Sequence, residues 1–146
     1  LQIHKPSTAS ASTIFVGHEY AKEYLRSLVR RGSSMITFIK NYTTTDGYTF
    51  RMSIVTFTQR RVNTSAKHEI RLLIDKMLSE KIIQLGLDQF IQEVTLGGLS
   101  KELLVESKKI AFIRHLGIKK SKLISTPESR SIFEAKQIET PPTITA

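Results

Sequence analysis

The sequence has no cysteine and no tryptophan among its 146 residues. The absence of cysteine excludes disulfides, thiolate zinc sites and cysteine nucleophiles from this part of the protein. Uninterrupted apolar stretches reach only about four residues, whereas a helix that spans a bilayer needs about 20. No secretory leader is recognisable. Because the chain begins at Leu1 rather than at methionine, we expect that an N-terminal part has been lost or processed.

Acidic residues are scarce relative to basic ones. Thirteen Asp and Glu accompany 22 Lys and Arg, which leaves a net charge of +9 and a pI near 9.9. Residues 125–146 carry a net charge of −1, so the first 124 residues carry +10, from 20 basic and 10 acidic residues. A folded region with this charge repels itself, and a polyanion is the usual partner that relieves the repulsion. Nucleic acid is the leading candidate, and an acidic membrane surface is the alternative.

The chain lacks the residue patterns that enzymes and metal sites use. His68 and Glu69 are adjacent, but Leu72 stands where an H-E-x-x-H motif needs its second histidine. Gly97 and Gly98 have neither dinucleotide-binding nor Walker spacing, and no serine lies in a G-x-S-x-G pattern. We therefore expect no enzyme activity, no metal and no cofactor. The histidines, interpreted as solvent-facing or RNA-contacting, are His4, His18, His68 and His115.

Helical periodicity and end signals predict four helices. Gly32 and Gly86 are expected to end the first two, and Ser100 is expected to cap the last. The predicted helices cover residues 18–31, the stretch from the capping residues 63–65 to about residue 84, residues 88–94, and residues 101–109.

A β-hairpin gives the strongest local signal. Residues 35–44 and 48–58 are rich in Ile, Val, Thr, Phe and Tyr, and an Asp-Gly dipeptide lies between them. This dipeptide favours a two-residue type I′ turn, in which both central residues have positive φ. Apolar residues occur on both faces near the base of the hairpin, so we expect burial on both sides there. The predicted pairs are Thr45 with Tyr48, Ile39 with Ile54, Phe38 with Val55, and Ile36 with Phe57.

The hairpin needs partner strands, because two strands are not stable alone. Residues 110–122 are predicted to form a strand that ends in a basic stretch, and residues 111–119 are the candidate partner. The predicted fold class is therefore α+β, with the hairpin forming part of a barrel-like sheet packed with about four helices.

Basic residues recur at the ends of the predicted elements and in loops. A single basic pair is often only a solvated surface, but this recurrence favours contact with an RNA backbone, where Lys and Arg neutralise phosphates. Tyr20, Tyr24, Tyr42 and Tyr48 could stack on bases, although no RNP-type aromatic pattern indicates sequence-specific reading. The candidate RNA-binding residues are Lys22, Arg26, Arg30, Arg31, Arg51, Arg60, Arg61, Lys67, His68, Arg71, Lys108, Lys109, Arg114, His115, Lys119, Lys120 and Lys122.

The predicted organisation has three parts. Residues 1–16 are an extended or linking segment, residues 17–124 are an RNA-binding α+β domain with an incomplete barrel, and residues 125–146 are an extended tail.

A distinctive pattern surrounds the hairpin: Met35 and Ile36, the run T-T-T-D-G-Y at residues 43–48, Arg51, and the run F-T-Q-R-R at residues 57–61. This pattern resembles the small-subunit ribosomal protein S-three-a family of eukaryotes and archaea, which has a similar T-T-D-G-Y turn between two strands. The resemblance extends over residues 17–122. The chain departs from the family pattern in three ways. Its basic loop after Arg61 is shorter, it has Leu72 and Asp75 where the family is more polar or basic, and it lacks the family's N-terminal half.

The resemblance implies a structural, non-catalytic role on the platform of the small ribosomal subunit, near the messenger RNA exit. It implies a cytoplasmic location, no cofactor, no membrane partner, contact with small-subunit rRNA and neighbouring ribosomal proteins, and an indirect link to initiation factors. Two alternatives stay open. One is a free-standing basic RNA-binding or translation-factor domain that shares only the hairpin and helix, and the other is an enzyme such as a nuclease.

Overall fold

The computed structural model describes residues 1–6 and 10–127. Strands β3, β6, β5 and β4 form an antiparallel sheet in that order, and β1 pairs with β2 in a separate two-stranded sheet. The α+β class and the four helices agree with the sequence prediction. The elements are β1 (Gln2–Pro6), β2 (Ala11–Ile14), β3 (Gly17–Glu19), α1 (Lys22–Leu28), β4 (Met35–Thr43), β5 (Thr49–Thr58), α2 (Thr64–Ile82), α3 (Leu87–Leu96), α4 (Gly98–Ser107) and β6 (Ile113–Ser125).

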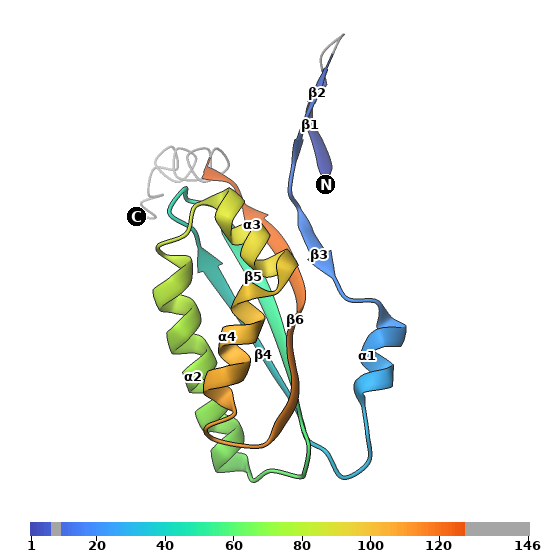
Figure 1. Cartoon of the computed structure of the whole chain (residues 1–146). Coiled ribbons are helices and arrows are strands. Elements are labelled where there is room, and N and C mark those ends of the chain that lie inside the picture. The colour runs from blue at the N-terminus through green and yellow to red at the C-terminus, as the bar shows by residue number, and fades with distance from the viewer. Residues whose placement is uncertain (7–9, 128–146) are drawn as a thin grey trace, which may run out of the picture.

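The four-stranded sheet is open within the described ranges, with β3 and β4 as its edges, so the barrel-like description holds only loosely. The β1–β2 hairpin projects away from the body of the molecule (Figure 1). Most of the predicted tail, residues 128–146, lies outside the described residues.

One face of the sheet packs against helices α2, α3 and α4, which gather on the same side of it (Figure 1). Phe50, Met52 and Ile54 alternate along β5 and are at most 1% exposed, because successive strand residues point to opposite faces. Helix α2 buries residues at four-residue steps, which fall on one helix face. Each such large side chain contributes about 1.5–3 kcal/mol when fully buried. The α2 residues are Ile70, Ile74, Leu78 and Ile82.

The hairpin forms in the predicted place, but its register differs from the prediction by one residue. The Thr44 N–H donates to the Tyr48 carbonyl at 2.9 Å, which leaves a three-residue loop. In that loop only Gly47 has a positive φ, of 81°. The prediction of a type I′ turn is therefore wrong, and the loop is of the three-residue kind with a left-handed last residue. The predicted pairs are wrong as well: the observed ones are Thr43 with Thr49, Ile39 with Ser53, Phe38 with Ile54, and Ile36 with Thr56.

The turn is docked on the segment between α2 and α3. The Asp46 carboxylate accepts a hydrogen bond from the Leu87 N–H at 2.5 Å, at the first residue of α3. The Thr45 hydroxyl donates to the Leu85 carbonyl at 2.7 Å. These contacts give Asp46 a helix-capping role, which a local turn prediction could not contain.

The opposite face of the sheet is covered by α1 over part of its area. Val55 and Phe57 of β5 are 2% and 1% exposed, and they line a groove together with Leu25 of α1. Met35 and Ile39 of β4 are 58% and 60% exposed. Burial on both faces is therefore confirmed for β5 and wrong for β4, an edge strand of the described sheet whose outward side chains stay exposed although Met35 borders the same groove.

Two helix predictions need correction at their ends. The first helix is shorter than residues 18–31, because His18 and Glu19 pair with β6 as part of β3. In the last helix Ser100 lies inside α4 rather than at its cap. Gly97, with φ of 80°, joins α3 directly to α4, so the chain changes direction through a left-handed glycine without a polar cap.

Strand β6 is the predicted partner of the hairpin, and it pairs with β5 along its whole length. Three register shifts interrupt the ladder and leave Arg114, Lys119 and Ile124 as extra residues on β6. A bulge changes which face the following residues occupy. Before the bulge at Lys119, Ile118 is 1% exposed in the core; after it, Lys120 is exposed to solvent.

Candidate nucleic-acid interface

Three chain connections meet where β5 ends. The connections from α1 to β4, from β5 to α2 and from α4 to β6 all lie at the lower end of the molecule in Figure 1. The Gln59 N–H donates to the Phe112 carbonyl at 2.8 Å and so joins the second connection to the third. These connections carry six exposed basic residues, which we call the basal cluster: Arg30, Arg31, Arg60, Arg61, Lys108 and Lys109.

Two buried hydroxyl groups join the first connection to the second. Thr58 is 0% and Ser34 is 6% exposed. The Thr58 hydroxyl donates to the Arg60 carbonyl at 2.7 Å and accepts from the Ser34 N–H at 2.9 Å. The Ser34 hydroxyl accepts from the Val62 N–H at 3.2 Å. Because buried polar groups are costly to leave unpaired, this network holds the backbone on both sides of Arg61.

Acidic residues in the described part of the chain neutralise little of the charge of the basal cluster. Lys109 forms an ion pair with Glu106 at 2.8 Å. The other five residues have no acidic partner among the described residues. Exposed cations without counter-charges create a positive potential that attracts anions, and phosphate is the group that Arg binds bidentately.

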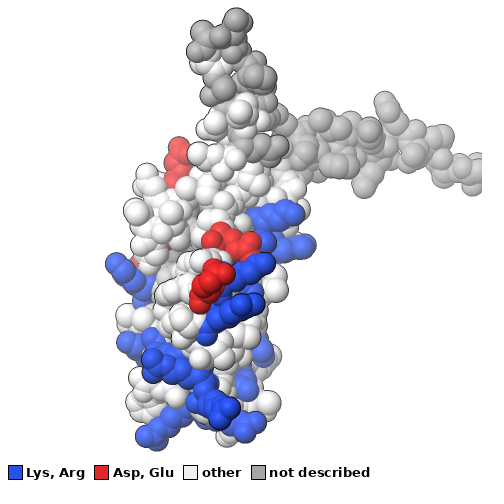
Figure 2. All heavy atoms as spheres, turned by 90° about the vertical axis from the view of Figure 1, so that its right-hand side faces the viewer, with Lys and Arg blue, Asp and Glu red and all other residues white. Residues whose placement is uncertain are grey.

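A second group, which we call the sheet-face cluster, lies on the side of the sheet that carries α1. It comprises Lys22 and Arg26 of α1, Arg51 of β5, and Lys119, Lys120 and Lys122 of β6. Figure 2 views this side of the molecule, with Lys and Arg spread over its lower and middle parts and few Asp or Glu among them. The Lys119 bulge contributes to the cluster, because it turns the lysines that follow it away from the core.

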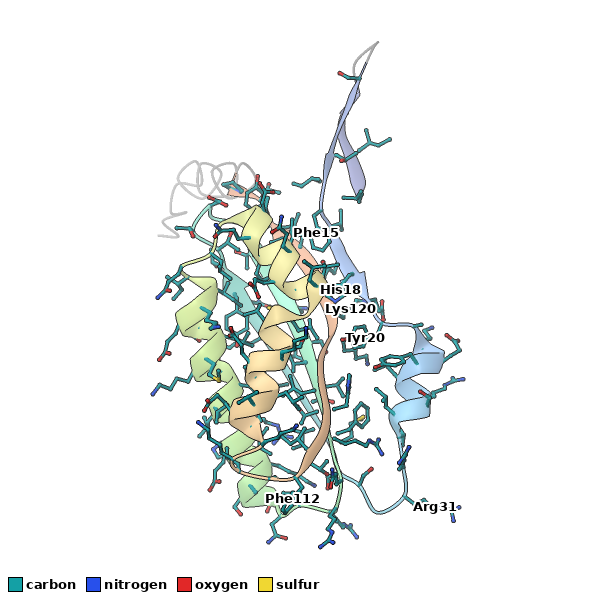
Figure 3. All side chains as sticks on the ribbon, in the orientation of Figure 1. Phe15, His18, Tyr20, Arg31, Phe112 and Lys120 are labelled. Atoms are coloured by element: carbon teal, nitrogen blue, oxygen red, sulfur yellow. The ribbon has the colours of Figure 1, made fainter. Side chains whose placement is uncertain are left out.

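Part of the sheet-face cluster is already paired. Lys120, labelled in Figure 3, forms an ion pair with Glu19 across the β3–β6 ladder at 2.8 Å. The hydrogen bond from Lys120 holds the pKa of the Glu19 carboxyl below its usual value. The Arg51 Nε donates to the Asn41 amide oxygen at 3.0 Å. Because the Asn41 amide is neutral, Lys120 is the one ion-paired member of this cluster in the described ranges, as Lys109 is in the basal cluster.

The remaining candidate residues lie in two further places. Lys67, His68 and Arg71 occupy the first two turns of α2, and the Arg71 Nε donates to the Thr37 carbonyl at 3.4 Å. Arg114 and His115 have inward contacts instead. The Arg114 guanidinium donates to the Leu28 carbonyl and so fixes the end of α1.

His115 lies in an aromatic group on the side of α1. Its ring centroid is 6.0 Å from that of Tyr24 and 6.5 Å from that of Phe57, and Tyr20 packs on Tyr24 at 5.5 Å. Burial, and then the charge of Arg114, lowers the pKa of His115. A histidine held neutral in this way is a poor ligand for phosphate.

The tyrosines differ in their access to solvent. Tyr24 is 44% exposed, whereas Tyr48 packs against the core. Tyr42 is 7% exposed and donates to Asp75 at 3.0 Å, and its pKa is raised by burial and then by this hydrogen bond. The suggestion that all four tyrosines could stack on bases is therefore wrong for Tyr42.

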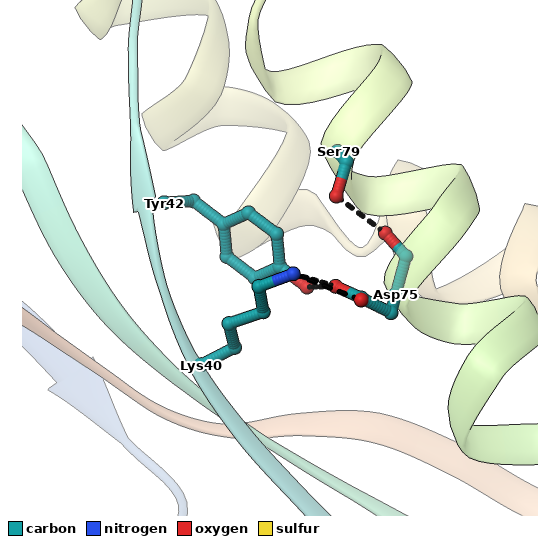
Figure 4. A network of polar contacts seen from close by, with 4 residues as sticks. All are labelled: Lys40, Tyr42, Asp75 and Ser79. Atoms are coloured by element: carbon teal, nitrogen blue, oxygen red, sulfur yellow. Dashed lines mark hydrogen bonds and ion pairs between the residues drawn. The ribbon is translucent and has the colours of Figure 1, made fainter.

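Asp75, one of the departures from the family pattern, links β4 to α2 (Figure 4). Its carboxylate accepts from the Lys40 ammonium at 2.6 Å as well as from Tyr42, and its carbonyl accepts from the Ser79 hydroxyl at 2.7 Å. The hydrogen bond from Lys40 is the largest cause that lowers the pKa of Asp75. This network serves the packing of the sheet on α2.

One residue that the sequence prediction did not select belongs to this end of the molecule. Phe112, between the basic pair 108–109 and β6, is 75% exposed. An aromatic residue within a basic run was the signal that could have identified it, but its exposure depends on the position at which β6 begins.

Other kinds of site find no support in the described part of the chain. No group of three or more His, Asp or Glu residues there could hold a metal ion. None of its helices is both long and apolar enough to cross a membrane.

Comparison with known proteins identifies relatives. The family model described as the Ribosomal S3Ae family matches residues 1–127. The chain is 42% identical over 117 residues to the small ribosomal subunit protein eS1 of Sulfolobus acidocaldarius, covering 80% of this chain and 59% of that relative. It is 41% identical over 127 residues to the small ribosomal subunit protein eS1 of Saccharolobus solfataricus, covering 87% of this chain and 59% of that relative. The chain thus spans about three fifths of the length of these relatives, and it belongs to the Ribosomal S3Ae family.

Proposed function

We propose that the chain is a structural constituent of the small ribosomal subunit that binds rRNA phosphates and supports platform assembly and translation. The basal cluster carries this proposal, because five of its six cations have no acidic partner in the described ranges. The relatives, small ribosomal subunit proteins eS1, favour a ribosomal role over other RNA-binding roles. The proposed partners are small-subunit rRNA, neighbouring ribosomal proteins and initiation factors, in the cytoplasm.

Binding would rest on phosphate neutralisation rather than on reading of bases. Each Lys or Arg that meets a phosphate releases condensed counterions, which supplies much of the affinity for nucleic acid. Phosphate contacts of this kind fix the position of a protein on RNA without choosing a sequence. The rigid hydroxyl network at Ser34 and Thr58 would lower the entropic cost of ordering the Arg60–Arg61 backbone on binding. No reaction is proposed.

A sucrose gradient of cell lysate tests the proposal. We expect the chain to sediment with the small subunit and with translating ribosomes, and to stay there through a high-salt wash. The double substitution Arg60→Glu and Arg61→Glu should reduce incorporation at least several-fold, because it replaces two phosphate ligands with repelling carboxylates. The measurement is the fraction of the tagged chain in the small-subunit peak.

Lys76→Glu with Lys101→Glu is the matched control. It makes the same change in net charge at two exposed helix positions outside the candidate residues, and incorporation should stay close to the unmodified level. Equal incorporation of the two double variants would contradict the role of the basal cluster. Release of the unmodified chain by mild salt would favour the second candidate, a free-standing RNA-binding or translation-factor domain, which the high positive charge also suits.

A further inference from the structure

Phe112 is an exposed aromatic side chain with no role in the core. Phe50, Phe57 and Phe90 are at most 1% exposed, and Phe15 and Phe38 pack against the core, whereas Phe112 is 75% exposed. The next residue, Ile113, is 3% exposed, and Phe112 precedes it at the start of the strand. Exposing a whole phenyl ring forgoes the roughly 1.5–3 kcal/mol that its burial would contribute, which is a reason to look for a ligand.

The position of Phe112 is fixed by the sheet. Its carbonyl accepts the Gln59 N–H at 2.8 Å, which extends the β5–β6 ladder by one step beyond the pair Thr58 and Ile113. The backbone that carries the ring is therefore held against the end of β5. A ring held in this way loses little conformational entropy when it binds a ligand.

Basic residues lie near this position along the chain and next to its ladder partner Gln59. Arg60 and Arg61 follow Gln59 directly, and Lys108 and Lys109 precede Phe112 by four and three residues. Figure 3 labels Phe112 at the lower end of the molecule, the end that carries the basal cluster. Arg60, Arg61 and Lys108 have no acidic partner in the described part of the chain.

An unpaired RNA base fits this combination better than an apolar protein surface. A protein that covered Phe112 would also bury neighbouring unpaired cations, which is costly without counter-charges. A single strand of RNA brings its phosphates to the cations and its bases to the ring, and stacking on an aromatic side chain accepts any base. Double-helical RNA presents no free base face.

We propose that Phe112 is a stacking site for one unpaired base of an RNA strand whose phosphates bind the basal cluster. This inference rests on the proposed function in requiring that the basal cluster binds RNA. It adds that the contacted strand is unpaired at this point.

The test compares single-stranded and double-stranded RNA. Fluorescence anisotropy would measure the dissociation constants of the full chain for a short adenosine oligomer and for a duplex of similar length. Phe112→Ala should weaken binding of the single strand by about 5- to 100-fold and leave duplex binding within about two-fold. Phe112→Tyr should keep the affinity, because it preserves the ring.

Leu96→Ala is the matched control, because Leu96 is 78% exposed in α3 and lies outside the basal cluster. It should leave both affinities unchanged, and thermal melting should be the same for all three variants. The unmodified chain should bind an oligomer with one abasic position at the stacked nucleotide more weakly than the intact oligomer. Phe112→Ala should bind the two oligomers equally, as expected for two changes that remove the same interaction.

The outcomes separate this inference from the proposed function. If Arg60→Glu with Arg61→Glu weakens binding of both RNAs but Phe112→Ala weakens neither, the stacking site is wrong and the phosphate site stands. If Phe112→Ala weakens single strand and duplex equally, the ring does not stack on a base. If neither change affects either RNA, both proposals fail.

Discussion

Single hydroxyl and carboxyl groups decide how the loops and the edge strand of this chain are held. Ser34 and Thr58 show this at the basal end, where two buried hydroxyls bond the backbone of two connections. Asp75 of α2 shows it at β4, where its carboxylate accepts hydrogen bonds from Lys40 and Tyr42 of that strand. Within the described ranges β4 has a neighbouring strand on one side only, and these contacts add to its attachment to α2.

Asp75 predicts a pH dependence of stability. Its pKa is lowered in the folded chain, first by the hydrogen bond from Lys40, so the ionised form favours folding. This contribution is fully present above the ordinary carboxyl pKa, near 4, and is lost as pH falls through the lower folded value. Asp75→Asn should destabilise the chain by about 1 kcal/mol at neutral pH, a modest effect because the pair is partly exposed.

Urea unfolding at pH 7 and at pH 3 measures this effect. The difference in the free energy of unfolding between the unmodified chain and Asp75→Asn should shrink at pH 3, where the carboxyl of the unfolded chain is mostly protonated. A difference that is the same at both pH values would mean that Asp75 acts through packing and not through its charge.

At the scale of elements, the hairpin turn has a tertiary role. Thr45 and Asp46 bond the segment that leads into α3, while Gly47 takes the left-handed conformation that closes the loop. The residues of the T-T-D-G-Y run are therefore explained by docking of the turn on helices. RNA contact is better sought at the other end of the hairpin, where Arg60 and Arg61 follow β5.

Gly47→Val tests the turn. The substitution should lower the free energy of unfolding by about 1–2 kcal/mol, because a β-branched residue resists positive φ. The nearest atom to an added Cβ is the Pro127 Cβ at 3.5 Å, an ordinary contact, so the cost would be conformational and not steric. Thermal melting of the purified chain measures it.

Gly86→Ala is the control for this prediction. Gly86 has φ of −73°, which alanine adopts freely, and its added Cβ would lie 3.5 Å from the Asp46 carboxylate. Its melting temperature should change little. A similar loss in both variants would argue that the whole turn region tolerates no side chain, whatever its φ.

At the scale of the whole molecule, charge and topology act together. The first 124 residues carry +10, and the antiparallel order brings three basic connections to one end of the sheet. Net charge supplies general attraction to a polyanion, while the clustering creates a local site. Residues far apart in the sequence, such as Arg31 and Lys108, lie at the same end of the molecule because β4, β5 and β6 are adjacent.

The salt dependence of RNA binding should report this clustering. Plots of log affinity against log salt concentration should be linear with a negative slope. Arg60→Gln with Arg61→Gln should make this slope shallower by about 1.5, since each phosphate contact contributes about 0.7–0.9 to its magnitude. Anisotropy titrations over a range of potassium chloride concentrations measure the slope. Lys76→Gln with Lys101→Gln should leave it nearly unchanged, and equal slopes for the two pairs would mean that the charge acts diffusely.

Much of this description could be predicted from the sequence, because its signals are local. The periods of apolar residues predict the helices and strands of the core, since helix and strand geometry set which side chains share a face. Composition predicts the excess of positive charge, and the run at residues 43–48 indicates the family. The +10 of the folded region and the hairpin with its partner strand follow from the chain alone.

Tertiary structure decided the rest, because it depends on contacts between distant residues. The register of the hairpin follows from a three-residue loop docked on α3, and its Asp46 bond involves a residue 41 positions away. The Lys119 bulge sets which β6 lysines face solvent, and the end of β5 brings Phe112 beside Arg60 and Arg61. Local sequence determined which elements form, whereas the pairing of strands determined which of their side chains meet on one surface.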